Sequence, residues 1–455
     1  MSLIVVNIII VLIFSFNRQL LIIFGRMGVF CNKMAAEKSK FEGWLAYLRD
    51  ANVVRRTQEK CGVRVLSEVK TGEEEESRNI QVKPSTTSLV NGAIAKLSVT
   101  RPVRRKKARR KQPGIMIETI SPGEIASPPP IDYPDIIVET YPLVDAYFKL
   151  ATELGYEPFY IIFLGTLHWN IDTTVFRHAV LLWALSMYIG QALKNVFKWP
   201  RPSAPPAVRL EMKLKLEYEY GFPSTHATVS TTIPLYLLYI IHSRYESLFF
   251  TMIFISILWC TSVSFSRIYL GLHSYLDMIG GVIVSLIMLL ILLPLIDHMD
   301  HFIFNFKFFP VVAPLIILLL LYMYPVEVAW TSDRGDTAAI LGTLLGALLA
   351  IHFNGPFPDD LQPGPFPVAL PTYQSLGFGL LRFIVGVLLV FPTRFIMKLL
   401  CFRFLPAIMP SHGVVEVDKR PLVVLPYKII TYMSMALSAI YIGPRMFEIC
   451  DISRY

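Results

Sequence analysis

The sequence predicts an all-α membrane protein, a polytopic bundle of about eight or nine transmembrane helices. Hydrophobic residues make up 54% of its 455 residues and charged residues only 17%, and the mean hydropathy is +0.51. These values lie well outside the composition of an ordinary soluble domain. A series of apolar stretches, each near the roughly 20 residues that cross a bilayer as a helix, supports the same fold class. The eight clearest stretches are 174–193, 227–243, 247–265, 278–296, 307–324, 337–353, 376–400 and 427–443. A ninth, 143–167, is weaker because charged residues interrupt it.

The pattern divides the chain into three regions. Residues 1–140 are polar and charged beyond an apolar run at 3–25, which predicts a largely disordered tail behind a possible leading membrane segment. Within it, the amphipathic piece 41–54 is either a surface-bound helix or an ordinary tail helix. Residues 141–300 carry the chemical motifs and are expected to form the catalytic core. Residues 301–455 are expected to supply further transmembrane helices.

A strongly basic run stands out in the tail. Residues 101–111 contain eight cations and no acid, and the whole chain has a net charge of +9. This run is either a solvated arm or a contact for anionic lipid headgroups, worth about 1 kcal/mol per cation near the surface. No nucleic-acid recognition fold accompanies it, so we expect no nucleic-acid partner.

The sequence offers little support for a metal or a cofactor. Its five cysteines are scattered without a CxxC pair, which argues against a disulfide framework or a zinc knuckle. No phosphate-binding P-loop or dinucleotide fingerprint is present. The acidic and histidine residues at 297–301 either form a metal pair or a boundary loop after a span, and we favour the loop.

Three motifs bear on chemistry, and the first is cationic. Lys194, Lys198 and Arg201 follow the span at 174–193 with the spacing of one helix face. Pro200 and Pro202 should end that helix. Cations in this position often extend to lipid headgroups, yet Arg201 also offers the planar fork that suits a phosphate, and Lys194 a point charge.

The second motif is a hydroxyl-rich turn at 223–226. Ser224 and Thr225 are good residues to start a helix, and the free backbone N–H groups of a helix N-terminus bind anions. His226 follows directly. An ordinary helix cap with an interfacial histidine would look the same.

The third motif pairs a histidine with an aspartate. Arg267 ends one span, and His273 precedes Asp277 by one helical turn. At this spacing the carboxylate can accept the imidazole Nδ1–H and leave Nε2 free as a base or nucleophile. An i,i+4 polar pair at a membrane boundary is the alternative.

Topology should bring the three motifs together. Two spans, 227–243 and 247–265, separate His226 from Arg267. An even number of crossings returns the chain to the same face of the membrane. We therefore predict a phosphate-handling site, without a metal, at one membrane surface.

These motifs resemble the signature of the type 2 phosphatidic acid phosphatase superfamily, which includes lipid phosphate phosphatases and vanadium haloperoxidases. The shared patterns are K-x6-R-P, P-S-x-H and S-R-x5-H-x3-D. Further stretches resemble sphingosine-1-phosphate phosphatases, which share the threonine at position 225 where most of the superfamily has glycine. These stretches are 167–172, 187–206, 220–227, 266–277 and 425–436. The resemblance spans about 140–440, and faintly 41–64.

The resemblance implies a role for each matching residue. His273 would attack phosphorus and carry a phosphohistidine, Asp277 would orient it, and His226 would protonate the leaving oxygen and then activate water. The residues expected to hold the phosphoryl oxygens are Lys194, Arg201, Ser224, Thr225 and Arg267. No metal and no cofactor is implied.

The resemblance also implies a substrate and a place. We expect hydrolysis of sphingosine 1-phosphate and related sphingoid base 1-phosphates in the endoplasmic reticulum membrane. The rival activity is a broad lipid phosphate phosphatase acting on phosphatidate or lysophosphatidate, and the rival class is a non-catalytic transporter or scaffold. Glu211, Glu217 and Glu219 could partner a sphingoid ammonium or belong to a solvated loop. The family suggests a lumenal site, which requires a leading span.

Overall fold

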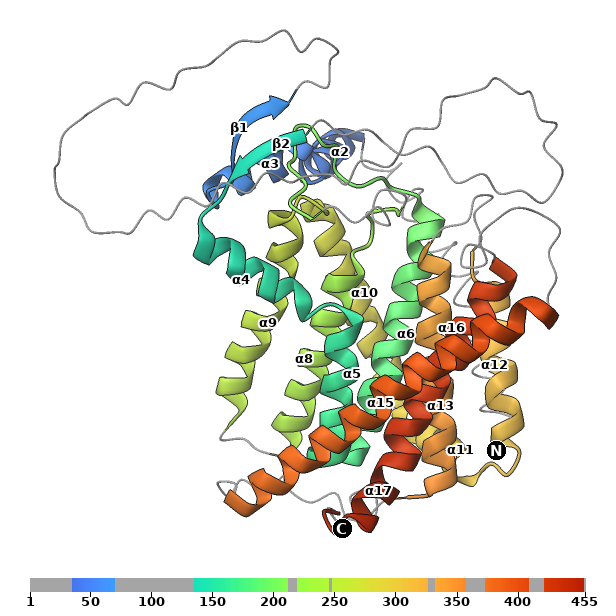
Figure 1. Ribbon diagram of the computed structural model, residues 1–455. Helices are drawn as coiled ribbons and strands as arrows, with labels where there is room; N and C mark the ends of the chain where they lie inside the picture. Colours follow the sequence, from blue (N-terminus) through green and yellow to red (C-terminus); the bar gives the residue numbers. More distant parts are fainter. Residues whose placement is uncertain are drawn as a thin grey trace, which may run out of the picture.

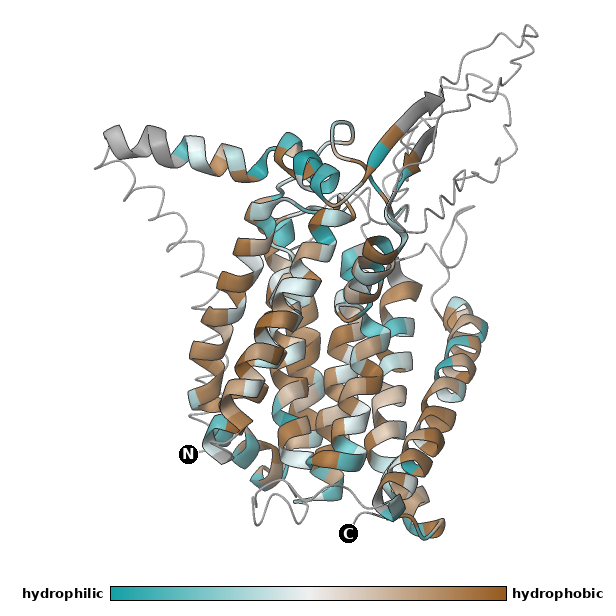
Figure 2. Cartoon of the chain, turned by 90° about the vertical axis from the view of Figure 1, so that its left-hand side faces the viewer, coloured by the Kyte–Doolittle hydropathy of each residue, from teal (hydrophilic) through white to brown (hydrophobic). Residues whose placement is uncertain are grey.

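The protein is a long bundle of helices with a small layer of N-terminal elements over one end (Figure 1). The computed structural model describes residues 35–69, 135–211, 219–244, 248–325, 332–356, 373–408 and 421–453. The possible membrane segment 3–25, the basic run 101–111 and Glu217 lie outside the described residues. Figure 2 shows apolar residues along the middle of the bundle and polar residues gathered toward its ends, as a membrane-spanning protein requires.

The N-terminal layer consists of two helices and a two-stranded sheet. Helix α2 (Ala35–Arg49) and helix α3 (Ala51–Lys60) meet at Asp50, whose side chain caps α3 by accepting from the Asn52 backbone N–H at 2.8 Å. Strand β1 (Arg64–Val69) pairs antiparallel with β2 (Asp135–Glu139). Residues 35–69 of the tail are folded, because the apolar side of α3 packs against the core through buried Val53 and Val54. For the tail as a whole, disorder stays a prediction.

The weak span expected at 143–167 is two helices. Helix α4 (Pro142–Glu153) and helix α5 (Glu157–Thr166) are separated by a turn at Gly155. The charged residues that interrupt the apolar pattern lie on α4 and at the start of α5. The interruption in the pattern therefore coincides with the break between the two helices. A π-helical turn (Leu167–Ile171) then leads into the core.

Four long helices form the part that carries the motifs. They are α6 (Thr173–Phe197), α8 (Thr225–Arg244), α9 (Phe249–Tyr269) and α10 (Tyr275–Leu292). Three of them meet through buried hydroxyls: Thr232 on α8 lies 2.9 Å from Ser285 on α10 and 3.4 Å from Ser186 on α6 (Oγ to Oγ). Small side chains let the three helices pack closely, as is common in membrane interiors.

The remaining helices complete the bundle. They are α11 (Ile296–Asn305), α12 (Phe309–Met323), α13 (Ser332–Asn354), α15 (Tyr373–Ile408), α16 (Pro421–Leu437) and α17 (Gly443–Ile449), with a π-helical turn (Ser438–Ile442) before α17. Within the described residues, six helices are long and apolar enough to cross a membrane. All eight clear stretches of the sequence coincide with helices, but α12 is short and the hydroxyl residues of α8 reduce its hydropathy. The count of eight or nine spans stays a prediction.

The acidic and histidine residues at 297–301 belong to α11 and not to a loop. Asp300 accepts two hydrogen bonds from Arg177 on α6, at 2.8 and 2.6 Å, and lies 2.7 Å from Nε2 of His178. This ion pair ties α11 to the start of α6, at the end of the bundle remote from the motifs (Figure 1). Within the described ranges, no group of three or more potential metal ligands is found.

Candidate active site

The three motifs meet at the end of the bundle that α2 and α3 cover (Figure 1). Lys194 lies in the last turn of α6, and Arg201 follows that helix. Ser224 directly precedes α8, and Arg267 lies in the last turn of α9. His273 stands just before α10, with Asp277 in its first turn. The two crossings of α8 and α9 bring Arg267 back to the level of His226, as the sequence predicts.

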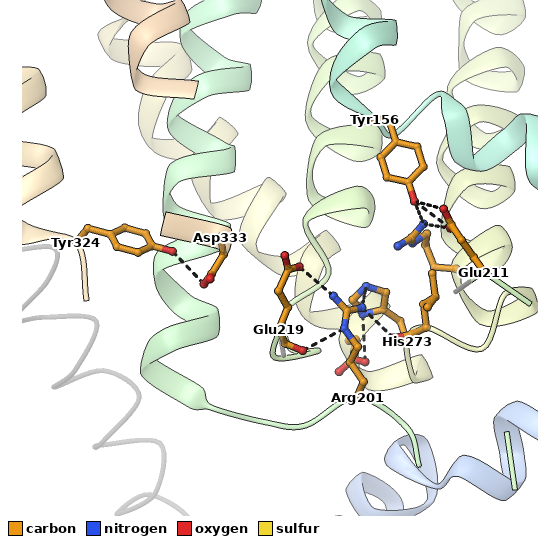
Figure 3. Close-up of polar contacts among 10 residues, drawn as sticks. Tyr156, Arg201, Glu211, Glu219, His273, Tyr324 and Asp333 are labelled. Carbon is orange, nitrogen blue, oxygen red and sulfur yellow. Dashed lines mark hydrogen bonds and ion pairs between the residues drawn. The ribbon is translucent and has the colours of Figure 1, made fainter. Parts of the chain in front are cut away.

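His273 is held between an acid and a cation. The side chain is 1% exposed, its Nδ1 lies 3.4 Å from Oδ2 of Asp277, and its Nε2 lies 2.9 Å from Nη1 of Arg201. A guanidinium can only donate, so Nε2 must accept and the ring proton belongs on Nδ1, facing Asp277. The lone pair of Nε2 is thereby directed into the cationic part of the site (Figure 3).

The electrostatics of the site keep His273 neutral. Burial lowers the pKa of His273 well below its usual range, and the charges of Arg201, Arg267 and Lys194 lower it further. Burial also lowers the pKa of Arg201, to about 10, while Glu219 opposes the shift. At neutral pH the site therefore contains a neutral imidazole beside a charged guanidinium.

Asp277 has a second, structural role that the sequence pattern did not reveal. Its Oδ2 accepts the Ser274 backbone N–H at 2.7 Å, and the Ser274 hydroxyl accepts the Asp277 N–H at 3.3 Å. This reciprocal capping box fixes the start of α10. Nδ1 of His273 lies 3.4 Å from the same oxygen without forming an aligned hydrogen bond.

Arg201 reaches the site from an extended segment and not from the helix face that its spacing suggested. Helix α6 ends at Phe197, and Lys198 adopts a left-handed conformation with φ of 54°. Pro200 disfavours helix at the residue before it, which explains the early end. Arg201 then donates to the carbonyl oxygens of Leu272 at 3.0 Å and Glu219 at 3.1 Å. Lys198 itself is exposed and lies outside the site.

Arg267 forms a second group of polar contacts, on the side of the site that faces α4 and α5. It is 1% exposed, and its Nη1 donates to the Thr152 hydroxyl at 2.8 Å and to the Tyr156 hydroxyl at 3.2 Å. The Tyr156 hydroxyl in turn donates to the Glu211 carboxylate, with both oxygens at 3.0 Å. Oε2 of Glu211 lies 3.8 Å from Nη1 of Arg267. Figure 3 shows Tyr156 and Glu211 of this group beside His273 and Arg201.

The turn between α4 and α5 packs directly against the His226 side chain. The Tyr156 ring meets the His226 ring edge-on, with centroids 4.7 Å apart. A Cβ on Gly155 would lie 2.3 Å from Cδ2 of His226, so only glycine lets the turn approach this closely. Neither residue was predicted, because a glycine and a tyrosine between two short helices carry no distinctive pattern.

The remaining predicted residues line the helix ends. Ser224 is fully buried, and its backbone N–H donates to the Asp277 carbonyl at 3.0 Å, which joins α8 to α10. Thr225 and Lys194 are also buried. Two helix N-termini, those of α8 and α10, therefore meet three cations, and their dipoles add positive potential where an anion would bind.

Helix α3 of the N-terminal layer joins two segments beside the site by hydrogen bonds. Gln58 on α3 is fully buried, donates to the carbonyls of Val208 at 2.6 Å and Tyr269 at 2.8 Å, and accepts the Val208 N–H at 2.9 Å. Gly271 has φ of +72°, and a Cβ there would lie 2.2 Å from the Val208 oxygen. The faint resemblance at 41–64 was the only sequence signal for this contact.

Comparison with known proteins identifies the family. The chain matches the PAP2 superfamily over residues 176–298. It is 36% identical over 314 residues to sphingosine-1-phosphate phosphatase 1 of Mus musculus, covering 67% of this chain and 72% of the relative. The chain belongs to the sphingosine-1-phosphate phosphatase family. It is also 34% identical over 326 residues to sphingosine-1-phosphate phosphatase 2 of Homo sapiens, covering 69% of this chain and 80% of the relative.

A more distant relative has a broader name. Lipid phosphate phosphatase delta of Arabidopsis thaliana is 28% identical over 280 residues, covering 60% of this chain and 66% of the relative. No solved structure matches the chain. The region that matches the superfamily contains every site residue named from the sequence, from Lys194 to Asp277.

We expect Gly155→Ala to reduce phosphatase activity about 100-fold, because the new methyl group must displace the His226 ring and misplacement of about 1 Å can cost that much. The matched control is Gly377→Ala on α15, where a Cβ meets nothing within 4 Å. Both variants should be purified in detergent and compared by kcat and by thermal unfolding. Equal activity of the two variants would show that His226 tolerates the shift or has no part in the reaction.

Proposed function

We propose that this protein hydrolyses sphingosine 1-phosphate and related sphingoid base 1-phosphates in the endoplasmic reticulum membrane, and that residues 141–300 form the catalytic core. The observation that carries the proposal is the neutral His273, whose Nε2 lone pair is directed at Arg201 while Nδ1 faces Asp277. The names of the relatives point to the same substrate class.

In the first step, His273 acts as the nucleophile. The Nε2 lone pair forms a bond to phosphorus as the bond from phosphorus to the ester oxygen breaks, and Asp277 stabilises the positive charge that develops on the ring. The leaving oxygen takes a proton from His226. Negative charge on the phosphoryl oxygens is stabilised by Lys194, Arg201, Ser224, Thr225 and Arg267.

In the second step, His226 acts as a base. It accepts a proton from water as the water oxygen bonds to phosphorus, and the bond from phosphorus to nitrogen breaks and returns its electron pair to Nε2. Inorganic phosphate leaves, and both histidines regain their starting state. Monoester hydrolysis without a catalyst is among the slowest reactions known, with enzymatic accelerations up to ~10²¹. The three buried cations and two helix N-termini supply the positive potential that such an acceleration needs.

The substrate reaches the site from the bilayer. The helices below the site are mostly apolar (Figure 2), so a single-chain lipid could keep its tail in the membrane and present its phosphate to the polar end. Lysophosphatidate, with one chain, and phosphatidate, with two, also present a phosphate from the bilayer. A broad lipid phosphate phosphatase therefore stays the second candidate, supported by the relative from Arabidopsis thaliana.

Competition between lipids tests the proposal. Purified protein should be offered sphingosine 1-phosphate and phosphatidate at equal surface fractions in mixed micelles, and kcat/KM compared. We expect a preference of at least about tenfold for sphingosine 1-phosphate, the effect of one charge-assisted contact. Equal values would favour the broad activity. No phosphate release from either lipid would favour a non-catalytic transporter or scaffold.

A further inference from the structure

Two half-buried carboxylates lie beside the arginines of the site. Glu219 lies 3.4 Å from Arg201, with its side chain 7% exposed, and Glu211 lies 3.8 Å from Arg267, with its side chain 19% exposed. Figure 3 shows the two acids on different sides of the group. Carboxylates are unexpected in a site for phosphate, because they repel the ligand.

The charges of the site make this repulsion significant. The side chains of Lys194, Arg201 and Arg267 bring three positive charges, and those of Asp277, Glu211 and Glu219 bring three negative charges. The acids therefore offset part of the positive potential that binds a phosphate dianion. A substrate that carries its own positive charge next to the phosphate would be repelled less by these acids.

The two acids differ in their relation to the reaction. Phosphoryl transfer places the nucleophile and the leaving oxygen on opposite sides of phosphorus. Glu219 contacts Arg201, which contacts His273, and so belongs to the nucleophile side. Glu211 accepts from Tyr156, whose ring packs against His226, and so belongs to the side of the leaving oxygen.

We propose that Glu211 binds the ammonium group of the substrate. This inference rests on the proposed function and names the feature that the site recognises, a phosphate ester whose alcohol carries an ammonium on the carbon adjacent to the ester carbon. In such a molecule only two carbons separate the ester oxygen from nitrogen, so the ammonium must lie close to the guanidinium that binds the phosphoryl group. Oε2 of Glu211 lies 3.8 Å from Nη1 of Arg267, and the Tyr156 hydroxyl orients its carboxylate.

Glu219 is unsuited to the same task. Its carboxylate is nearly inaccessible, and Arg201 binds both its side chain at 3.4 Å and its backbone carbonyl at 3.1 Å. It neutralises and positions the arginine beside His273. An ammonium on the leaving alcohol would be on the far side of phosphorus from it.

The test compares Glu211→Gln with the wild-type protein on three lipids, sphingosine 1-phosphate, its N-acetyl derivative and lysophosphatidate. Only the first carries an ammonium. We expect kcat/KM for sphingosine 1-phosphate to fall about 10- to 100-fold, the effect of one hydrogen bond to a charged group. The values for the two lipids without ammonium should stay the same or rise, because a repulsive charge has been removed.

Two control variants separate this result from simpler ones. Glu153→Gln removes an exposed carboxylate of nearby α4 and should change no ratio. Glu219→Gln should lower activity on all three lipids by the same factor, since it acts through Arg201. If Glu211→Gln lowers all three lipids equally, Glu211 is only a counterion of Arg267 and the proposal is wrong.

The design also separates failure of the proposal from failure of the proposed function. Wild-type protein that shows no preference between sphingosine 1-phosphate and lysophosphatidate would already contradict the sphingoid assignment, whatever the variants do. If Glu211→Gln does not fold, Glu211→Asp keeps the charge on a shorter side chain. It should retain only part of the preference for sphingosine 1-phosphate, because the shorter side chain moves the carboxylate. Complete loss of the preference would also support the role of carboxylate position. An unchanged preference would contradict it.

Discussion

His273→Ala is expected to abolish turnover and phosphoenzyme formation together. The substitution removes the atom that bonds to phosphorus, and the side chains at its two ring nitrogens are a cation and an acid, Arg201 and Asp277. A guanidinium is no nucleophile, and the Asp277 carboxylate is held by the cap of α10. The measurement is transfer of labelled phosphate from substrate to protein, quenched in base because phosphohistidine is labile in acid, alongside steady-state release of phosphate.

The size of the loss of activity distinguishes a nucleophile from a general acid or base. General acid–base assistance alone is worth about 10²–10⁴ in rate, so loss of a nucleophile should exceed that range. Residual activity above about a hundredth of wild type would show that His273 is not the nucleophile. The control is His301→Ala, which removes an exposed histidine from α11 at the remote end of the bundle. It should leave labelling intact.

His226→Gln is expected to cost about 10²–10⁴ in turnover of the lipid, the range for loss of a general acid and base. The loss should depend on the leaving group. A sphingoid alkoxide needs a proton when it departs, whereas a nitrophenolate does not. With p-nitrophenyl phosphate the first step should therefore proceed, while attack of water on the phosphoenzyme stays slow.

The observable is accumulation of labelled protein. His226→Gln with an aryl phosphate should hold a larger fraction of phosphoenzyme than the wild type at steady state, and His273→Ala should hold none. Identical losses of phosphoenzyme formation for the lipid and the aryl phosphate would contradict the acid role. In that case His226 would act on substrate binding and not as the acid for the leaving oxygen.

Sequence reasoning located the site because its motifs are local and the spans between them are regular. The spacing of His273 and Asp277 defines one helical turn, and two apolar stretches fix the side to which Arg267 returns. Both deductions need only helix periodicity and bilayer thickness. The structure brings these residues together, although His273 lies just before α10 and its Nδ1 is 3.4 Å from Asp277 without an aligned hydrogen bond.

The parts that sequence reasoning missed depend on contacts between distant segments. Gln58 meets Val208 and Tyr269 across 150 and 211 positions, and a single glutamine in a polar region gives no hint of that. Tyr156 and Gly155 are important only because the His226 ring packs against them. Arg201 was placed on a helix face because its spacing allowed it, while Pro200 ended the helix sooner than the pattern implied.

The buried hydroxyl contact among Ser186, Thr232 and Ser285 connects the membrane interior to the chemistry. The three helices that share it also carry Lys194, Ser224 and Asp277 at their ends, so a slip of one residue along any helix would move its end by about 1.5 Å. Alignment of the catalytic groups is thus fixed partly in the middle of the bilayer. A bulky substitution at that depth would leave every catalytic atom present, and we expect it to lower activity by shifting the helix ends relative to one another.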